Sequence, residues 1–499
     1  MPEPETGALD QAHQGAVRSK LGEVRRHERL DGGQGNGSQG HGVDTIAAVA
    51  TAIAAGQGSV AIVRMSGPEA EPIGRSLFRA PGQQTWDSHR VLYGHVVDPA
   101  SGERVDEALL LLMRAPRSFT RETVVELHCH GGLMAVQRVL ELVLAAGARR
   151  ALPGEFSQRA FLNGRLDLTR AEAVSEMITA RSRRAAQLAM AGLDGGLQRR
   201  IAELREQLLD QLAELEARVD FEEDLPPLDA AAVVAALAGV REQLEALVRE
   251  ARQGELLREG LRVAIVGRPN VGKSSLLNRL SQRERAIVTD LPGTTRDLLE
   301  SELVLDGVPL TLLDTAGIRP TQDRVEQLGI ARSRAALAAA DVVLLLFDLA
   351  AGWAPADQEL REQVPEGVPL LVVGNKADAA DLEAGAIHPG NLPTASPADV
   401  AISALSGDGC EALAQLLLQR CGAGEAQGMQ VALNARQRDL AAAAAASLER
   451  SLEAADQQLP WDFWTIDLRA AVRALGEITG EEVSEAVLDR VFARFCIGK

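Results

Sequence analysis

The sequence predicts a multidomain protein with an N-terminal α+β domain, an all-α helical domain, and an α/β domain with a mostly parallel sheet inserted into the helical one. Three observations predict this arrangement. The 499 residues are enough for about three domains, each with its own core. Strand-like runs fill residues 44–150, whereas apolar residues at helical spacing fill 197–258 and 434–494. Between these helical stretches, strands alternate with helices, and neither helical half has an obvious partner of its own.

The composition is that of an ordinary globular chain, with 46% hydrophobic and 24% charged residues. The net charge of -18 argues against a broad electrostatic grip on RNA or DNA, so a nucleic acid contact is expected to be local or shared with a partner. The longest apolar run, Val342 to Phe347, is too short to cross a bilayer and predicts a buried strand instead. We therefore expect no membrane span. We also expect a reducing, cytoplasmic location, because the four cysteines are scattered without metal-ligand spacing: Cys129, Cys410, Cys421 and Cys496.

Residues 1–42 are polar and rich in glycine, and they lack the apolar stretch of a signal peptide. We expect a disordered extension or a start codon placed too early, with a functional tail as the remaining alternative. Order is expected to begin near Asp44.

Residues 43–160 are expected to form the α+β domain. Its predicted strands are DTIAAVAT, SVAIVRM, EALLLLM and TVVELHCHGG, and Leu133 to Ala146 is predicted to be an amphipathic helix. The predicted strands carry polar side chains among their apolar residues. Taken alone, such a side chain is more often structural than functional. The triplet His128-Cys129-His130 has no second ligand cluster, so a zinc site is not expected there.

The helical domain is expected in two parts, residues 161–258 and 426–499, around an inserted domain at 259–425. A helix is predicted from Leu166 onward, with Thr169 as its N-cap. Apolar spacing and breaking residues predict five further helices, at 197–219, 229–258, 434–455, 466–475 and 482–494.

The segment Gly267 to Ser275 reads GRPNVGKSS and contains the G-x-x-x-x-G-K-[ST] phosphate loop. Leu261 to Val266 before it predicts a strand, and SLLNRL after it predicts a helix, so the loop has the flanks that the motif needs. Backbone N–H groups and the helix N-terminus would face the phosphates. Lys273 would reach the β and γ oxygens, and the Ser274 hydroxyl would bind Mg²⁺.

The remaining parts of a nucleotide site follow in a fixed order. Thr295, in the segment GTTRD, offers a second hydroxyl for Mg²⁺ that engages only while the γ-phosphate is present, so hydrolysis would release this loop. Asp314 follows the strand Leu310 to Leu313 and would hold the metal's ligand shell. The amide of Gly317 can meet the γ-phosphate.

The segment NKAD predicts guanine recognition. The Asp378 carboxylate can accept hydrogen bonds from N1 and N2 of guanine, which adenine cannot donate. Backbone amides of Ser403, Ala404 and Leu405 would complete the base pocket. GTP is therefore expected rather than ATP, and Leu261 to Gln419 resembles the translation-factor class of GTPases.

The hydrolytic water needs a group to orient it. Ile318 stands where the Ras-type enzymes carry glutamine, so a nearby carboxylate is the natural substitute. Asp323 and Glu326 are the candidates, and either could instead be a solvated surface charge. No basic residue is obvious as an arginine finger, but a bound monovalent cation could supply the charge, with the amide oxygen of Asn270 as a ligand.

Five segments outside the nucleotide domain are distinctive: DTIAAVAT, VAIVRMSG, VVELHCHGG, LPGEFSQRAFLNGRLDLTRAEAVSEMI and the terminal CIGK. They resemble the MnmE (TrmE) family of tRNA-modification GTPases, and the resemblance covers about Asp44 to Lys499. The PGEF-x-x-RAFLNG-[KR]-LDL stretch and the C-x-GK end are together highly specific. The chain departs from the family pattern at Ala52 to Ser59, which reads AIAAGQGS instead of PPG-x-GG, and at Arg121, where glycine is usual.

The resemblance implies an N-terminal folate-binding domain that dimerises, a helical domain and an inserted GTPase domain. It implies a homodimer that forms a heterotetramer with the flavin-dependent partner MnmG (GidA). Together they would add an aminomethyl or carboxymethylaminomethyl group to carbon five of the wobble uridine in certain tRNAs. A tetrahydrofolate derivative would donate the one-carbon unit, and GTP hydrolysis would be activated by K⁺.

The resemblance and the motifs together imply the site residues. The implied folate contacts are Arg64, Glu126, Arg165 and Lys499. The implied catalytic residues are Glu326, which would orient the water, and Cys496, the thiol of the end motif. Mg²⁺ is expected at Ser274 and Thr295, and K⁺ at Asn270, Thr289, Leu291 and Thr294. The full GTP-binding set is Asn270, Val271, Gly272, Lys273, Ser274, Ser275, Thr289, Asp290, Leu291, Pro292, Gly293, Thr294, Thr295, Asp314, Thr315, Ala316, Gly317, Asn375, Lys376, Ala377, Asp378, Ser403, Ala404 and Leu405.

Elementary chemistry agrees with several of these assignments. The guanidinium of Arg64 or Arg165 could hold the glutamate tail of a folate bidentately, and Glu126 suits the aminopyrimidine edge of a pterin. Cys496 stands close to Lys499, whose charge favours a thiolate, although an ordinary terminal cysteine is the alternative. The competing function is a ribosome-assembly or regulatory GTPase switch, which would lack the folate-type motifs and the CIGK end. A catalytically dead scaffold is opposed by the intact GTP motifs.

Overall fold

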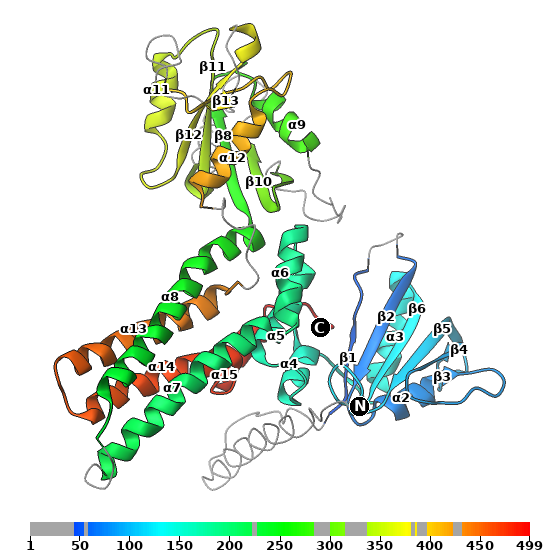
Figure 1. Cartoon of the computed structure of the whole chain (residues 1–499). Coiled ribbons are helices and arrows are strands. Elements are labelled where there is room, and N and C mark those ends of the chain that lie inside the picture. Colours follow the sequence, from blue (N-terminus) through cyan, green and yellow to red (C-terminus); the bar gives the residue numbers. More distant parts are fainter. Residues whose placement is uncertain are drawn as a thin grey trace, which may run out of the picture. The chain divides into compact units, whose positions relative to one another are not determined.

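A computed structural model describes residues 44–53, 58–221, 227–283, 300–314, 337–380, 385–386, 397–422 and 432–499. The predicted extension at 1–42 lies outside these residues. The described chain forms two compact units: residues 44–172 together with Gly476–Lys499, and Ala173–Leu475. The predicted multidomain fold class is confirmed, with an α+β part, a helical part and an α/β part (Figure 1). The predicted domain boundaries stay predictions.

The first unit is built on a seven-stranded sheet in the order β3-β4-β5-β6-β2-β1-β7. All neighbouring strands are antiparallel except β1 and β7. The four predicted strands are confirmed, and an additional long strand, β4, was not predicted. The strands are β1 (Ile46–Val49), β2 (Val60–Ser66), β3 (Phe78–Arg79), β4 (Arg90–Val97), β5 (Arg104–Met113), β6 (Val124–His130) and β7 (Arg149–Arg150).

Two helices, α2 (Ala70–Leu77) and α3 (Leu133–Ala145), pack against one face of this sheet. Alternate strand residues such as Val63, Leu110 and Leu127 point into that layer and are fully buried. Residues between them, including Arg64 and Glu126, point to the opposite face, where the functional side chains gather.

Three helices complete the first unit: α4 (Glu155–Leu162), the start of α5 (Leu168–Thr179), and α15 (Glu485–Phe492). The prediction of Thr169 as an N-cap was wrong. The backbone N–H of Arg170 donates to the Asp167 carboxylate at 3.0 Å, and the Thr169 hydroxyl donates to the same carboxylate. Asp167 is the better cap because its charged oxygen accepts both bonds, and Thr169 lies in the first turn.

The helical part of the second unit contains five helices: α6 (Arg183–Leu193), α7 (Gly196–Phe221), α8 (Ala230–Glu259), α13 (Ala435–Asp456) and α14 (Trp461–Thr479). Asp229 and Asn434 cap α8 and α13, as expected from the sequence positions of these helices. The apolar stripe of α7 is buried and α8 packs against both α7 and α13. Helix α14 begins at Trp461, earlier than the predicted Ile466.

The α/β part holds a seven-stranded sheet in the order β13-β14-β12-β11-β8-β10-β9. It is parallel from β14 to β10, and only the edge strands β13 and β9 are antiparallel, which confirms the mostly parallel sheet. The strands are β8 (Leu261–Gly267), β9 (Glu300–Leu305), β10 (Val308–Asp314), β11 (Val342–Asp348), β12 (Leu370–Asn375), β13 (Gly385–Ala386) and β14 (Val400–Ala401). The described helices include α9 (Lys273–Arg283), α11 (Pro355–Glu362), the short η2 (Ala377–Ala379) and α12 (Cys410–Arg420).

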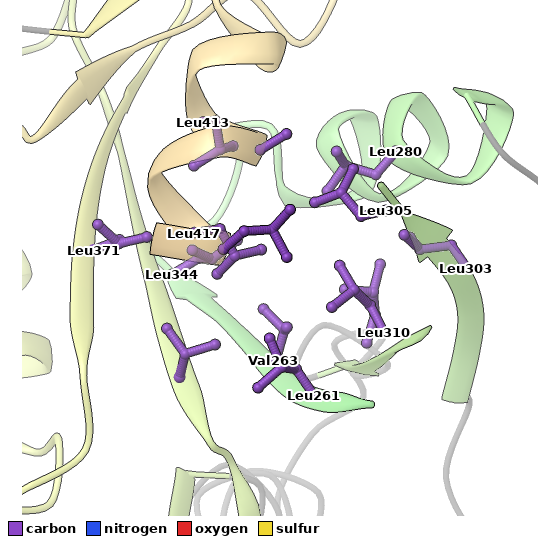
Figure 2. Packing of buried hydrophobic residues seen from close by; sticks show 14 of the residues in the cluster. Leu261, Val263, Leu280, Leu303, Leu305, Leu310, Leu344, Leu371, Leu413 and Leu417 are labelled. Carbon is purple, nitrogen blue, oxygen red and sulfur yellow. The ribbon is translucent and has the colours of Figure 1, made fainter. Parts of the chain in front are cut away.

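The core of this part lies between the sheet and the helices α9 and α12. Figure 2 shows Leu344 and Leu371 from the central strands packed with Leu413 and Leu417 of α12. The run Val342 to Phe347 is buried throughout, as predicted. Within the described ranges, no helix has the length and hydropathy that a bilayer crossing requires.

Candidate functional site

The phosphate loop connects β8 to α9, and its glycines are required by close packing. A Cβ on Gly267 would lie 2.3 Å from the carbonyl oxygen of Leu346, and a Cβ on Gly272 would lie 2.2 Å from Nδ2 of Asn375. Asn270 has a φ of 64°, a conformation that asparagine tolerates better than most residues. Gly267 and Gly272 therefore have no room for a side chain, and position 270 needs a residue that tolerates a left-handed backbone conformation.

Lys273 and Ser274 stand at the N-terminus of α9. The Lys273 ammonium donates to the carbonyl oxygens of Gly267 at 2.6 Å and Arg268 at 2.8 Å, so it bonds to the first two residues of the loop. The Ser274 side chain is exposed at the helix start. A helix N-terminus with an ammonium and an exposed hydroxyl is a site that fits a nucleotide phosphate with its Mg²⁺.

An ion pair that sequence reasoning missed anchors the phosphate loop. Arg268 Nε donates to Oδ1 of Asp357 at 2.8 Å, and Arg268 Nη2 donates to the carbonyl of Gly352 at 3.3 Å. Asp357 is fully buried, and its Oδ2 accepts from the backbone N–H of Ala354 at 3.0 Å. Nothing in the motif spacing indicates this pair, because Asp357 lies on α11, 89 residues away.

Asn375 joins the phosphate loop to the predicted base-recognition segments. Its Nδ2 donates to the carbonyl of Val271 at 2.7 Å, and its Oδ1 accepts from the backbone N–H of Ala404 at 3.0 Å. The Ala404 amide is therefore bonded within the protein, and Leu405 is 79% exposed. Arg279 of α9 donates to the carbonyl oxygens of Ala404 and Leu405, which ties this loop to the helix after the phosphate loop.

The NKAD turn is held by a second ion pair. Lys376 has a φ of 64°, and its ammonium lies 2.7 Å from Oδ2 of Asp348 at the end of β11. Burial is the largest single influence and opposes ionisation of Asp348. The hydrogen bond and charge of Lys376 and the backbone N–H groups of Ala350 and Ala351 together outweigh it and lower the pKa of this carboxyl. Asp378 is exposed two residues further on, where its carboxylate is available to a base.

Several predicted nucleotide and cation residues lie outside the described part of the chain. Asp314 is the last residue of β10, at the carboxyl end of the parallel sheet where ligands of such folds bind. The residues outside are Thr289, Asp290, Leu291, Pro292, Gly293, Thr294, Thr295, Thr315, Ala316, Gly317, Asp323 and Glu326.

Two of the implied folate residues, Arg64 and Glu126, lie together on the face of the sheet opposite α2 and α3. Arg64 on β2 and Glu126 on β6 are cross-strand partners, and Arg64 Nε donates to Glu126 Oε1 at 2.7 Å. Arg64 Nη1 donates to the carbonyl oxygen of Gly498 at 3.2 Å, and its guanidinium lies 5.8 Å from the ring centre of Phe156. The structure thus brings together two strands and the last residues of the chain.

Glu126 is ionised within this cluster. Burial opposes its charge, but the hydrogen bond with His128 at 3.2 Å and the charge of Arg64 outweigh burial, so the pKa of the Glu126 carboxyl is lowered. Cys129, on the same strand, points to the opposite face of the sheet. Burial raises the pKa of its thiol to about 12, so it stays a neutral core residue.

The glycine of the terminal CIGK segment allows the segment to pack closely against β1. Gly498 has a φ of 93°, and a Cβ there would lie 2.5 Å from the carbonyl oxygen of Val49 on β1. The carbonyl of Cys496 accepts from the backbone N–H of Lys499 at 3.3 Å and from that of Gly154 at 3.4 Å. Cys496 itself is exposed, so the thiol is accessible beside this cradle.

Arg165 stands at the other end of a small aromatic cluster. Its guanidinium lies 5.0 Å from the ring centre of Phe119 and donates to the Phe119 carbonyl at 3.2 Å. Phe119 packs against the cluster that contains Phe156, over which Arg64 lies. Arg64 and Arg165 therefore lie at two ends of one apolar cluster, whose members Ile46, Ala48, Ala151 and Phe156 are buried and whose Phe119 is partly buried.

Comparison with known proteins identifies the family. The family description "MnmE helical domain" matches residues 168–496, and "GTP-binding protein TrmE N-terminus" matches residues 45–165. The chain belongs to the MnmE family of tRNA modification GTPases. A curated MnmE of Synechococcus sp. (strain RCC307), named as a tRNA modification GTPase, is 72% identical over 457 residues, which are 91% of this chain and 98% of the relative. The same-named protein of Prochlorococcus marinus (strain MIT 9313) is 68% identical over 462 residues, with the same shares of both chains.

Two solved structures resemble about a third of this chain. A variant of Aquifex aeolicus Era bound to GDP.AlF4- is 28% identical and covers 38% of this chain and 66% of its own, with a TM-score of 0.26. The G domain of the T. maritima FeoB iron transporter is 26% identical and covers 32% of this chain and 98% of its own, with a TM-score of 0.24. Because both TM-scores are low, we draw no conclusion from these two structures.

A buried ionic network beside Arg64 and Glu126 was missed by sequence reasoning in this MnmE-family chain. Arg159, only 3% exposed, lies 2.7 Å from Asp44, 3.1 Å from Glu122 and 3.2 Å from Glu155. Arg149 pairs with the same Glu155 at 2.6 Å. Four of these groups lie in or beside the PGEF segment and residues 119–123 (FTRET), which contain Arg121, so these segments contribute to the scaffold of the site as well as to its surface.

Proposed function

We propose that this chain is a K⁺-activated GTPase that acts with the flavin-dependent partner MnmG on tRNA in the cytoplasm. The pair would add an aminomethyl or carboxymethylaminomethyl group to carbon five of the wobble uridine, with a tetrahydrofolate derivative as the one-carbon donor. Family membership supports GTP binding and a role in tRNA modification. The finer parts rest on the site geometry and on the resemblance of the motifs.

The observation that carries the proposal is that the Arg64 guanidinium bonds to both the Glu126 carboxylate and the Gly498 carbonyl oxygen. An ionised carboxylate, a half-buried guanidinium and the glycine of the terminal C-x-GK segment converge beside the apolar cluster that contains Phe156. Glu126 would accept hydrogen bonds from the aminopyrimidine edge of a pterin, and Arg64 or Arg165 would hold its carboxylates. The folate, when bound, supplies the one-carbon unit.

The nucleotide half would use the predicted residues as follows. Backbone amides of the phosphate loop and the Lys273 ammonium would neutralise the phosphates, and Asp378 would select guanine. Ser274 and Thr295 would bind Mg²⁺. Four ligands would hold K⁺ in place of an arginine finger, namely Asn270, Thr289, Leu291 and Thr294, while Glu326 would orient the hydrolytic water.

The exposed thiol of Cys496 is proposed as a catalytic group of the modification reaction. Its accessibility beside the Gly498 cradle supports this assignment. We also propose a homodimer that pairs with MnmG in a heterotetramer. With a net charge of -18, the partner is expected to provide most of the affinity for tRNA.

Mass spectrometry of tRNA nucleosides tests the proposal. A strain without this gene is complemented with wild type, with Cys496→Ser or with Cys421→Ser, a control cysteine on the nucleotide domain. We expect modified wobble uridines to vanish in the deletion strain and to return with wild type and Cys421→Ser only. Unchanged nucleosides in the deletion strain would refute the proposal and favour a ribosome-assembly or regulatory switch.

A further inference from the structure

Two arginines of the first unit are held together where two turns meet. Arg121 Nη1 donates to the carbonyl oxygen of Asn163 at 3.1 Å, and Arg165 Nη1 donates to the carbonyl oxygen of Phe119 at 3.2 Å. Asn163 Nδ2 also donates to the carbonyl of Thr120 at 2.8 Å. Each turn therefore fixes the arginine of the other, and we name Arg121 and Arg165 the guanidinium pair.

The guanidinium pair has no anion of its own among the residues that the structure describes. Neither arginine forms an ion pair there, because the nearby carboxylates are engaged elsewhere. Glu122 bonds to the hydroxyl of Ser66 and to Arg159, and Asp167 caps α5. Burial, and after it the charge of Arg121, lowers the pKa of Arg165, as expected where two cations face each other without a neutralising group.

The backbone at Arg121 adds to this cost. Its φ is 58°, in the left-handed region where a residue with a Cβ is less stable than glycine by about 1 kcal/mol. The chain thus places an unpaired cation on a strained turn beside another unpaired cation. An anionic ligand between the two guanidinium groups would offset the repulsion.

The guanidinium pair is continuous with the proposed folate face. The Arg165 guanidinium stacks on Phe119 at 5.0 Å, and Phe119 packs on the cluster that contains Phe156. Arg64, paired with Glu126, lies 5.8 Å from the ring of Phe156. Because Phe156 is buried, this apolar cluster positions Arg64 at one end and the guanidinium pair at the other.

We propose that the guanidinium pair binds the γ-linked glutamyl tail of a folate, with Arg121 taking carboxylates beyond the first glutamate. This inference rests on the proposed folate function and deepens it by naming poly-γ-glutamyl folates as the preferred form. The groups are pre-organised by backbone carbonyls, as suits recognition of carboxylates at fixed spacing. A tRNA phosphate is the competing ligand, but a chain with a net charge of -18 has little positive electrostatic potential to attract a nucleic acid.

The test measures binding of mono- and triglutamyl 5-formyltetrahydrofolate to the full-length protein by calorimetry. We expect wild type to bind the triglutamate about tenfold more tightly than the monoglutamate, since charge-assisted pairs are gained. Arg121→Gln and Arg121→Gly should lose this preference while monoglutamate affinity stays within about twofold. The glycine variant suits the positive φ, so backbone strain cannot explain its result. Arg117→Gln, an exposed arginine of the same loop, should behave as wild type.

The outcomes separate the two proposals. Tight monoglutamate binding without any triglutamate preference in wild type would overturn the guanidinium-pair inference and leave the proposed folate function intact. Absence of binding to both folates would overturn both. Retained triglutamate preference in the Arg121 variants, together with weaker tRNA retention on filters, would overturn the inference and assign the pair to RNA.

Discussion

The Nη1 atom of Arg64 donates a hydrogen bond to the carbonyl oxygen of Gly498 at 3.2 Å, although 434 positions separate the two residues in the sequence. The same guanidinium pairs with Glu126 through Nε. One side chain therefore couples the central strands of the first unit to the terminal C-x-GK segment, and the predictions below begin with that coupling.

Replacing Gly498 with alanine should detach the terminal segment. The new Cβ would lie 2.5 Å from the Val49 carbonyl at a φ of 93°, so the segment must move and Arg64 loses its acceptor. We expect faster amide exchange at residues 496–499 and roughly tenfold weaker binding of 5-formyltetrahydrofolate by calorimetry. Gly102→Ala is the matched control, because its φ of 75° is also positive but its Cβ would meet nothing within 4 Å. Equal effects in both variants would contradict the specific contact.

Replacing Glu126 with glutamine should destabilise the first unit by roughly 1–3 kcal/mol, because the half-buried Arg64 loses its charged partner. Urea unfolding with Glu103→Gln, an exposed control, measures this loss. Because the folded-state pKa of Glu126 lies below its ordinary value of 4.5, its contribution is full above that value and is lost as pH falls through the lowered pKa. The stability difference between wild type and Glu126→Gln should therefore shrink in acid, and a difference that grows there would refute the assignment.

Replacing Asp357 with alanine should loosen the phosphate loop. Arg268 and the backbone N–H of Ala354 would both lose their acceptor in a fully buried place, which costs on the order of 2–4 kcal/mol of unfolding free energy. We expect the Kd for a fluorescent GTP analogue to rise about fivefold to tenfold, since part of the binding energy then orders the loop. Glu359→Ala, on the exposed side of the same helix, should leave both quantities unchanged. Unaltered GTP affinity in Asp357→Ala would show that the pair serves stability alone.

Replacing Asp378 with asparagine should exchange guanine for xanthine specificity. The amide nitrogen would face the N1 and N2 donors of guanine, whereas xanthine offers a carbonyl oxygen at carbon two that the amide can meet. GTP affinity should fall by roughly a hundredfold and XTP hydrolysis should appear, because an unpaired buried polar edge costs that much. Steady-state phosphate release with GTP and XTP measures both. Retained GTP preference would exclude Asp378 as the reader of the base.

The nucleotide half could be predicted because its signals are local. The phosphate loop, the strands before it and after it, and the turn at Asn375 are each specified by adjacent residues, and the structure reproduces them within one or two positions. Strand β4 escaped prediction because both of its faces carry apolar residues and Gly94 interrupts the run. That glycine is needed because a Cβ would lie 2.3 Å from the Arg79 carbonyl, a contact that no local pattern reveals.

The sequence alone determined the multidomain fold class, the α/β character of the nucleotide part, and the family through its terminal and PGEF motifs. The domain boundaries and the choice of guanine through Asp378 stay predictions. Only the tertiary structure decided that Arg64 meets Gly498 and that Asp357 anchors Arg268. It also decided that Arg121 and Arg165 lie together without an ion-pair partner among the described residues. The physical reason is the separation along the sequence of the residues that interact. Helix caps, turns and loop motifs are fixed by neighbours along the chain, whereas ion pairs and glycine cradles depend on which distant segments the packing of the core brings together.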